Sequence, residues 1–209
     1  MVRQQLAEAV PVSRQPKKQV EVLNVASDYF LSHGYKGTSI NAMARDSGIS
    51  KESIYRYFSS KKQLFEAVIA KELAEYRKKV QFLDYETASI PLDAALRRIA
   101  ETILGVVTTD RTLALRRLIF QQVRQSPDIG QYYYEIGPQA AYANLEKIFA
   151  AHRDETEFDP ESLAHYFVSM ALHRSTLQRE CGVARPLSRA RIREQAARTT
   201  GDFLKAFFK

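Results

Sequence analysis

The sequence contains a single cysteine, Cys181, among its 209 residues, so no disulfide bond can form within one chain. Such sparing use of cysteine is typical of proteins from a reducing compartment. No apolar stretch is long enough to cross a membrane, and the first residues lack the apolar core of a signal peptide. From these absences we expect a cytoplasmic protein that does not enter a membrane.

Glycine and proline are also scarce, with eight and seven residues respectively, and no segment shows sustained alternation of β-branched residues. These features disfavour a β-sheet fold. Hydrophobic residues make up 45% of the chain, which is enough for a sizeable core, and no low-complexity tract predicts disorder. We therefore expect an all-α fold of about nine helices.

Acidic residues are few in the N-terminal part of the chain. Residues 1–62 hold 10 Lys and Arg against 5 Asp and Glu, whereas residues 63–209 hold 21 against 19. Most of the net charge of +7 therefore lies in less than a third of the chain. A basic N-terminal unit beside a nearly neutral body indicates a polyanionic partner for the first unit and a different partner for the second.

The first helical signals are spaced as in a helix-turn-helix. An apolar stripe predicts a first helix that ends at Gly34. A short second helix begins with Thr38 or Ser39 as its N-cap, and a third helix is capped by Ser50. The turn between the second and third helices contains Gly48, which permits a tight reversal.

Further boundary signals follow along the chain. Ile49 and Ile54 are placed to form a hydrophobic staple across the start of the third helix, and Ser60-Lys61-Lys62-Gln63 matches a capping box at the start of the fourth. Gly137-Pro138 falls inside a later helical pattern, where the proline should remove a helical hydrogen bond and free the carbonyl of Tyr134; the alternative is a simple kink. The five later helical patterns cover 92–107, 111–125, 127–151, 160–178 and 188–208.

The third helix is predicted to expose a polar face opposite the buried Ile54. That face carries side chains of the types that read base edges and phosphates, although a solvated face of a small helical bundle explains the same pattern. These side chains are Lys51, Ser53, Tyr55 and Arg56. The start of the fourth helix favours DNA, because two lysines in a first turn oppose the helix dipole unless a phosphate binds there.

Several motifs follow one another between about residues 20 and 70. They are Gly34-Tyr35-Lys36-Gly37-Thr38-Ser39-Ile40, Ala42-Met43-Ala44, Ser47-Gly48-Ile49-Ser50 and Ile54-Tyr55-Arg56-Tyr57-Phe58, with Lys61 and Leu64-Phe65 after them. In this order they closely resemble the DNA-binding domain of the TetR family. In the later helices, Leu118-Ile119-Phe120, Ser126-Pro127-Asp128 and Tyr132-Tyr133-Tyr134 are similar to the AcrR- and AefR-like branch.

The resemblance implies a regulator of transcription with four regions. These are a flexible tail (1–16), a three-helix helix-turn-helix DNA-binding domain (17–62), a connecting helix and linker (63–90) and a helical domain for ligand binding and dimerisation (91–209). The third helix would enter the major groove of double-stranded operator DNA. The last two helices would form a homodimer.

The resemblance also implies roles for single residues in DNA binding. Tyr55 and Lys61 match positions that grip phosphates. The positions that face bases are matched by Lys51, Glu52, Ser53 and Arg56. Glu52 accepts from a cytosine amino group or orients Arg56 four residues later, and we favour the second role. The candidate DNA-binding residues are Thr38, Ser39, Ser50, Lys51, Glu52, Ser53, Tyr55, Arg56, Tyr57 and Lys61.

Two further sets of residues are expected in the body. Aromatic and polar side chains in the middle helices suit a ligand cavity, although each one singly also suits a core. The ligand-binding candidates are Phe120, Gln121, Tyr133, Tyr134, Tyr142, Tyr166, Met170 and His173. Apolar stripes on the last two helices suit a two-fold interface or a thick core within one chain. The dimer-interface candidates are Leu163, Phe167, Leu177, Ile192, Ala196, Phe203 and Phe207.

The sequence does not contain the motifs of the common enzyme classes. It has no Gly-rich phosphate loop, no nucleophile elbow and no metal-ligand spacing among its four histidines, so we expect no catalytic residues, metal or cofactor. The expected function is that of a repressor released from its operator by a small, mostly hydrophobic ligand. The alternatives are a helix-turn-helix protein that acts through a protein partner without a ligand and, least favoured, an enzyme.

Overall fold

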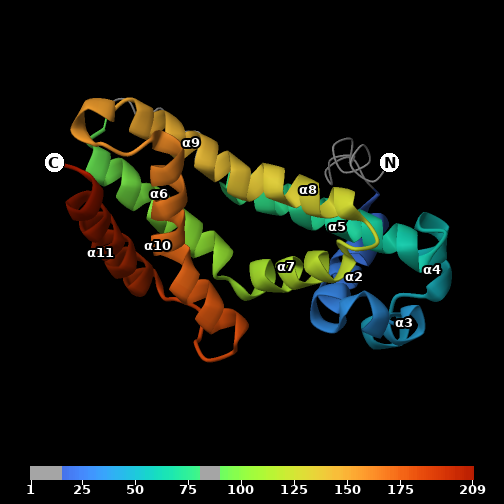
Figure 1. Cartoon of the computed structure of the whole chain (residues 1–209). Helices are drawn as coiled ribbons and strands as arrows, with labels where there is room; N and C mark the ends of the chain where they lie inside the picture. The colour runs from blue at the N-terminus through green and yellow to red at the C-terminus, as the bar shows by residue number, and fades with distance from the viewer. Residues whose placement is uncertain (1–15, 81–89) are drawn as a thin grey trace. The chain divides into compact units, whose positions relative to one another are not determined.

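The computed structural model describes residues 16–80 and 90–209, and within these ranges every regular element is a helix (Figure 1). The expected tail before Pro16 and the expected linker at 81–89 lie outside the described residues. No helix in the described ranges has the length and apolar character needed to cross a membrane. The elements are α2 (Lys17–Gly37), α3 (Ile40–Ser47), α4 (Lys51–Tyr57), α5 (Lys61–Val80), α6 (Leu92–Val107), α7 (Asp110–Gln122), α8 (Pro127–Tyr134), η4 (Glu135–Gln139), α9 (Ala140–Ala150), η5 (Arg153–Glu155), α10 (Pro160–Glu180) and α11 (Arg189–Phe207).

The all-α prediction is confirmed. With α8, η4 and α9 counted as one continuous helix, and the single 3₁₀ turn η5 set aside, the described residues form nine helices. The chain divides into two compact units, and the helices α5, α7 and α8 each contribute residues to both of them. Unit 1 contains the residues up to Glu75 together with Ala114–Tyr133. Unit 2 contains Tyr76–Leu113 together with Tyr134–Lys209.

Unit 1 is built round the first three helices, α2, α3 and α4, each of which contacts the other two. Phe30, Met43 and Ile54 supply one fully buried side chain from each helix. Glycine allows the chain to reverse between α3 and α4, because Gly48 has φ of 70°, a value that strains other residues. This turn sets the direction in which α4 leaves the core.

Unit 2 packs α6 against α10 and α11, and α10 also packs against α9. Its centre is an aromatic cluster in which Phe203 lies 5.1 Å from Phe167 and 5.5 Å from Phe149, measured between ring centroids. All three rings are fully buried, and truncating such a ring to alanine typically costs about 3–5 kcal/mol. The stripes on the last two helices therefore form the core of one chain.

The proline inside the α8–α9 helix is accommodated by a π-helical turn, η4, which contains Pro138. The predicted kink at Gly137-Pro138 is thus a change of helix type within a continuous helix. Gly137 is needed there, because a Cβ atom at this position would lie 2.5 Å from the hydroxyl oxygen of Tyr76. The Tyr76 ring is buried and has little room to move away.

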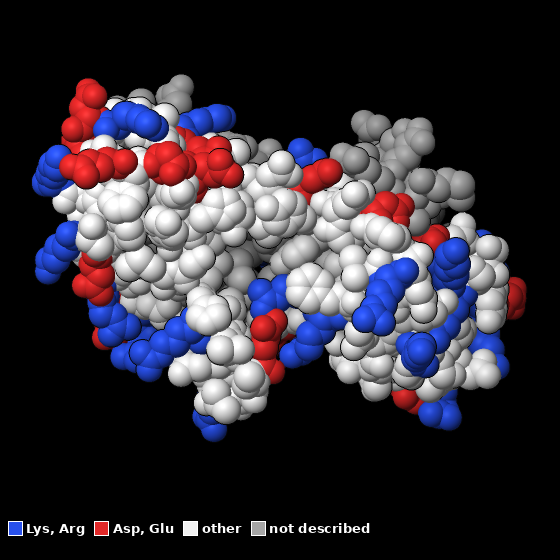
Figure 2. Space-filling model, viewed as in Figure 1, with Lys and Arg blue, Asp and Glu red and all other residues white. Residues whose placement is uncertain are grey.

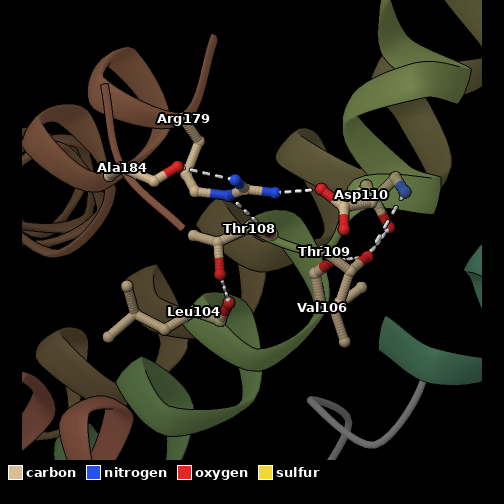
Figure 3. Close-up of polar contacts among 8 residues, drawn as sticks. Leu104, Val106, Thr108, Thr109, Asp110, Arg179 and Ala184 are labelled. Atoms are coloured by element: carbon tan, nitrogen blue, oxygen red, sulfur yellow. Dashed lines mark hydrogen bonds and ion pairs between the residues drawn. The ribbon is translucent and has the colours of Figure 1, made fainter. Parts of the chain in front are cut away.

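A single arginine ties the end of α10 to the turn between α6 and α7 (Figure 3). Arg179 donates through Nε to the carbonyl oxygen of Thr108 at 3.2 Å and through Nη1 to that of Ala184 at 2.8 Å, and its third nitrogen pairs with Asp110. The Arg179 side chain is only 8% exposed. Asp110 begins α7, so this cluster fixes the point from which α7 starts.

Candidate nucleic-acid interface

Helix α4 begins with the cap that the sequence predicts. The Ser50 hydroxyl oxygen accepts a hydrogen bond from the backbone nitrogen of Ser53 at 3.1 Å and donates to the Ser53 hydroxyl at 2.9 Å. Ile49 and Ile54 are both buried on either side of this cap, as a hydrophobic staple requires. Because Ile54 points into the core, the opposite side of this short helix faces solvent.

The exposed side of α4 carries an ion pair between two of the candidate base-reading residues. Arg56 Nη2 lies 3.1 Å from Glu52 Oε1, and both side chains are mostly exposed. Glu52 therefore holds Arg56 from one helical turn away, which is the role we favour for it. Lys51 and Tyr55 are exposed on the same short helix, and Tyr55 is 51% exposed despite its large ring.

The cap at the start of α3 decides between the two residues that the sequence offered for it. Ser39 is the N-cap, and its hydroxyl oxygen accepts from the backbone nitrogen of Ala42 at 3.4 Å. Thr38 is instead 3% exposed, and its hydroxyl donates to the carbonyl oxygen of Gly34 at 2.8 Å. The Thr38 hydroxyl is thus committed to closing α2 and is not presented to DNA, whereas Ser39 is exposed.

Helix α5 begins with a modified form of the predicted capping box. The Ser60 hydroxyl oxygen accepts from the backbone nitrogen of Gln63 at 3.1 Å, as expected. The Gln63 side-chain oxygen in turn accepts a hydrogen bond from the backbone nitrogen of Ser59 at 2.6 Å, one residue earlier than the motif predicts. Lys61 and Lys62 occupy the first turn, where the positive end of the helix dipole and two cations favour an anion.

Tyr35, to which the sequence assigned no role, lies against this first turn. The Lys61 ammonium nitrogen is 4.7 Å from the centroid of the Tyr35 ring, a cation–π contact. Tyr35 stands in the Gly34-Tyr35-Lys36-Gly37 motif, so the motif marks the residue without revealing its contact. Lys61 and Tyr35 are both half-buried.

A second tyrosine joins α2 to α3. The Tyr29 hydroxyl donates a hydrogen bond to the Asp46 carboxylate, and this bond, with help from Arg45 at 3.0 Å, holds the pKa of Asp46 below its usual value. The same bond raises the pKa of Tyr29. Helices α2 and α3, which flank Ser39, are thereby joined by a polar contact on the surface.

The remaining DNA-binding candidates lie on or beside this surface. Ser53 and Tyr57 are half-buried at the sides of α4. Figure 2 shows Lys and Arg side chains spread over the part of the view where Figure 1 places α3 and α4, with few Asp and Glu among them. A basic, serine-capped surface of this kind suits the phosphates of a nucleic acid.

The ligand-binding candidates are divided between the two units. Phe120, Gln121 and Tyr133 belong to unit 1, and the other candidates belong to unit 2. Within unit 2, Tyr142 is half-buried, and this burial, with the nearby Tyr134, raises its pKa. Three candidates on α10 are instead exposed, namely Tyr166, Met170 and His173.

Most of the dimer-interface candidates are corrected by their burial. Leu163, Phe167, Ala196 and Phe203 have no exposed surface, so they cannot contact a second chain without unfolding their own. Ile192 and Phe207 are half-buried, and Leu177 alone of the seven candidates is exposed. The sequence pattern found the apolar stripes but assigned the inner face of α10 and α11 to the wrong partner.

Two family models match the chain. Residues 22–68 match the model of bacterial regulatory proteins of the tetR family, and residues 94–208 match that of the AefR-like transcriptional repressor C-terminal domain. MftR of Mycobacterium tuberculosis, provisionally assigned as a mycofactocin biosynthesis transcriptional regulator, is 26% identical over 72% of this chain and 74% of its own. The nucleoid occlusion factor SlmA of Actinobacillus pleuropneumoniae is 26% identical over 76% of this chain and 82% of its own.

One solved structure is similar in both fold and sequence. The flavonoid-responsive regulator FrrA is 27% identical to this chain, with a TM-score of 0.64 over 92% of this chain and 97% of its own. The match extends over nearly all the residues that the structure describes.

Proposed function

The chain belongs to the TetR family of bacterial regulatory proteins, and from this premise we propose that it is a homodimeric repressor whose α4 helices bind operator DNA until a small, mostly hydrophobic ligand releases them. It is a DNA-binding transcriptional regulator and not an enzyme, because the matched models and relatives are regulators of transcription. It would act in the cytoplasm, beside the DNA that it binds.

The observation that carries the DNA-binding part is the surface of α4. A seven-residue helix with a capped start presents Lys51, Tyr55 and the Glu52–Arg56 pair to solvent, and the cationic first turn of α5 follows directly. Arginine held in one orientation is suited to donating two hydrogen bonds to guanine in the major groove. Lysine at a helix start is suited to a phosphate.

Exposed apolar side chains on α10 support the homodimer. At 100° per residue, Tyr166, Met170 and Leu177 lie within about 40° of one another round the helix, and each is 41–49% exposed. On α11 the exposed Ala197 shares a face with Gly201, where an added Cβ would meet no atom within 4 Å. We assign these two faces to the partner subunit, in place of the buried residues that the sequence suggested.

The ligand-dependent part rests on the family and on FrrA, a flavonoid-responsive regulator. We propose a mostly apolar or aromatic effector and retain Tyr134 and Tyr142 as candidate contacts in unit 2, because a tyrosine offers an apolar ring with a polar tip. Tenfold weaker binding of DNA by the ligand-bound form corresponds to about 1.4 kcal/mol.

The test is a titration of labelled DNA from the region next to the gene, with and without a panel of hydrophobic compounds that includes flavonoids. We expect the wild-type protein to bind this DNA more tightly than a mixed-sequence duplex, and one or more compounds to weaken that binding. A protein that shows no preference for any natural site would refute the repressor assignment.

A second function is favoured by the similarity to SlmA, a relative that is named for nucleoid occlusion. This name mentions no effector, so it fits the alternative of a helix-turn-helix protein that acts through a protein partner without a ligand. Sequence-specific DNA binding that no compound in the panel alters, together with retention of a protein partner on the DNA-bound form, would favour this alternative.

A further inference from the structure

Three aromatic residues of unit 1 form a packed cluster beside the start of α5. The Tyr35 ring meets the Phe65 ring edge-on at 4.8 Å and lies nearly parallel to the Phe30 ring at 6.2 Å, and Phe30 meets Phe65 edge-on at 5.2 Å. Phe30 and Phe65 are buried, so two sides of the Tyr35 ring are held by the core.

The break in α2 makes this cluster possible. Residues five positions apart lie about 140° apart round a regular helix, too far for two rings to stack. Gly34, between Phe30 and Tyr35, has φ of 71° and ψ of 174°, which turns the chain back towards the core. Residues other than glycine are strained at such a φ, so the position of the Tyr35 ring depends on Gly34.

The ring also carries the Lys61 ammonium nitrogen at 4.7 Å from its centroid. Lys62, one residue later, shows the contrast. Its ammonium nitrogen lies 3.9 Å from a carboxylate oxygen of Glu66, and 75% of its side chain is exposed. A carboxylate cancels the charge of a lysine, whereas an aromatic ring attracts the cation without adding a net charge. Lys61 thus keeps its full positive charge for another anion.

We propose that Tyr35 is a positioning residue for DNA binding, which holds the Lys61 ammonium group ready for a phosphate at the start of α5. This inference rests on the phosphate contact that the proposed function assigns to Lys61. Lysine loses rotamer freedom when it is fixed, and a side chain already ordered in the free protein loses less on binding. The ring occupies one side of the ammonium group and leaves donors on the other sides for phosphate oxygens.

The experiment measures affinity for a mixed-sequence DNA duplex as a function of salt, because phosphate contacts are independent of sequence. The variants are Lys61→Ala, Tyr35→Leu, Tyr35→Phe and the double variant Tyr35→Leu/Lys61→Ala. Lys61→Ala is expected to weaken binding and to lower the salt slope by about one unit. Tyr35→Leu is expected to weaken binding about two- to fivefold, from the usual strength of an exposed cation–π contact.

The double variant separates positioning from a general structural role. In the Lys61→Ala background, Tyr35→Leu should cause no further loss, and Tyr35→Phe, which keeps the ring, should bind more tightly than Tyr35→Leu. A matched cycle with Lys18, an exposed lysine on α2 that pairs with Glu21, should show additive effects. A Tyr35→Leu loss that persists without Lys61 would overturn the proposal, as would tighter binding by Tyr35→Leu, since the ring would then compete with phosphate.

A fluorinated ring separates the size of the Tyr35 side chain from the charge distribution over its face. Replacing Tyr35 with pentafluorophenylalanine keeps the size of the ring but reverses the charge distribution over its face, and it should weaken binding as Tyr35→Leu does. Unchanged affinity in a folded fluorinated variant would also overturn the positioning role. If Lys61→Ala itself leaves affinity and slope unchanged, the phosphate contact is wrong, and that outcome differs from a failure of Tyr35 alone.

Discussion

At the scale of single residues, the Glu52–Arg56 ion pair on α4 is expected to affect both the affinity for DNA and the discrimination between DNA sequences. Glu52 pairs with Arg56 across one helical turn, but in the proposed complex its carboxylate would also repel the DNA backbone. Glu52 therefore permits tight binding only at DNA sites where Arg56 gains a hydrogen-bonded base, because at other sites the repulsion between Glu52 and the phosphates is uncompensated. Arg56 and Glu52 should therefore affect specific and random DNA differently.

We predict that Arg56→Ala loses roughly 1–3 kcal/mol of binding free energy at one base pair of each half-site and little on random DNA. Glu52→Gln should bind random DNA more tightly and discriminate less. Titrations of both variants against operator and mixed-sequence duplexes measure the two effects. Equal losses on both DNAs for Arg56→Ala would make Arg56 a phosphate contact.

The Tyr29–Asp46 contact predicts a specific pH dependence. The Tyr29 hydroxyl, first, and Arg45, second, keep the pKa of Asp46 below its usual value in the folded protein. A carboxyl group with a lowered pKa adds stability above its unfolded pKa, and this contribution is lost as pH falls through the folded pKa. Tyr29→Phe should therefore lower the free energy of unfolding at neutral pH, and the difference from wild type should shrink below about pH 4.

Urea unfolding of both proteins across this pH range tests the linkage. Asp46→Asn should remove the same acid-dependent component, since it lacks the titrating group. A difference between wild type and Tyr29→Phe that stays constant from neutral to acid pH would show that the contact contributes through packing alone.

At the scale of elements, the joint made by Arg179 depends on the shape of its side chain. Three nitrogens of one guanidinium reach three different oxygen atoms, in Thr108, Asp110 and Ala184, and an ammonium group cannot match this arrangement. We predict that Arg179→Lys lowers the free energy of unfolding by about 1.5–3 kcal/mol, the usual strength of hydrogen bonds to a charged group.

Arg191 provides the matched control on α11. It forms an exposed ion pair with Glu194 at 2.9 Å, and such pairs contribute about 0–1 kcal/mol. Arg191→Lys should therefore leave chemical unfolding, followed by far-ultraviolet circular dichroism, almost unchanged. Similar losses in the two variants would mean that the Arg179 cluster adds no more than a surface contact.

Elements with local signals were predicted from the sequence, and those that depend on distant packing were not. The Ser50 cap and the Ile49–Ile54 staple are set by residues a few positions apart, so their spacing alone identifies them. The Tyr35–Lys61 contact joins two helices through a break at Gly34, which periodicity hides. The same limit explains Phe203, since an apolar stripe fits a core and an interface equally well.

For the whole molecule, the proposed dimer follows from the exposed faces of α10 and α11. We predict that Leu177→Glu, a charge on an exposed apolar position, converts the dimer to folded monomers in sedimentation experiments. Ala143→Glu, on an exposed position of α9 that shares a face with Lys147, is the control and should remain dimeric. Phe203→Glu should unfold the protein, because it buries an unpaired charge in the core. If the Leu177→Glu variant stays dimeric, the interface does not include this face of α10.

The exposed cysteine that caps the end of α10 has one further consequence for a protein of this kind. Since Cys181 is the only thiol in the chain, a two-fold dimer carries two equivalent thiols and no others. A spin label attached there reports a single distance between the protomers by pulsed electron paramagnetic resonance. The distance can thus be measured on the native sequence, without an engineered cysteine. A distance that changes when DNA or an effector is added would record the movement of one protomer against the other.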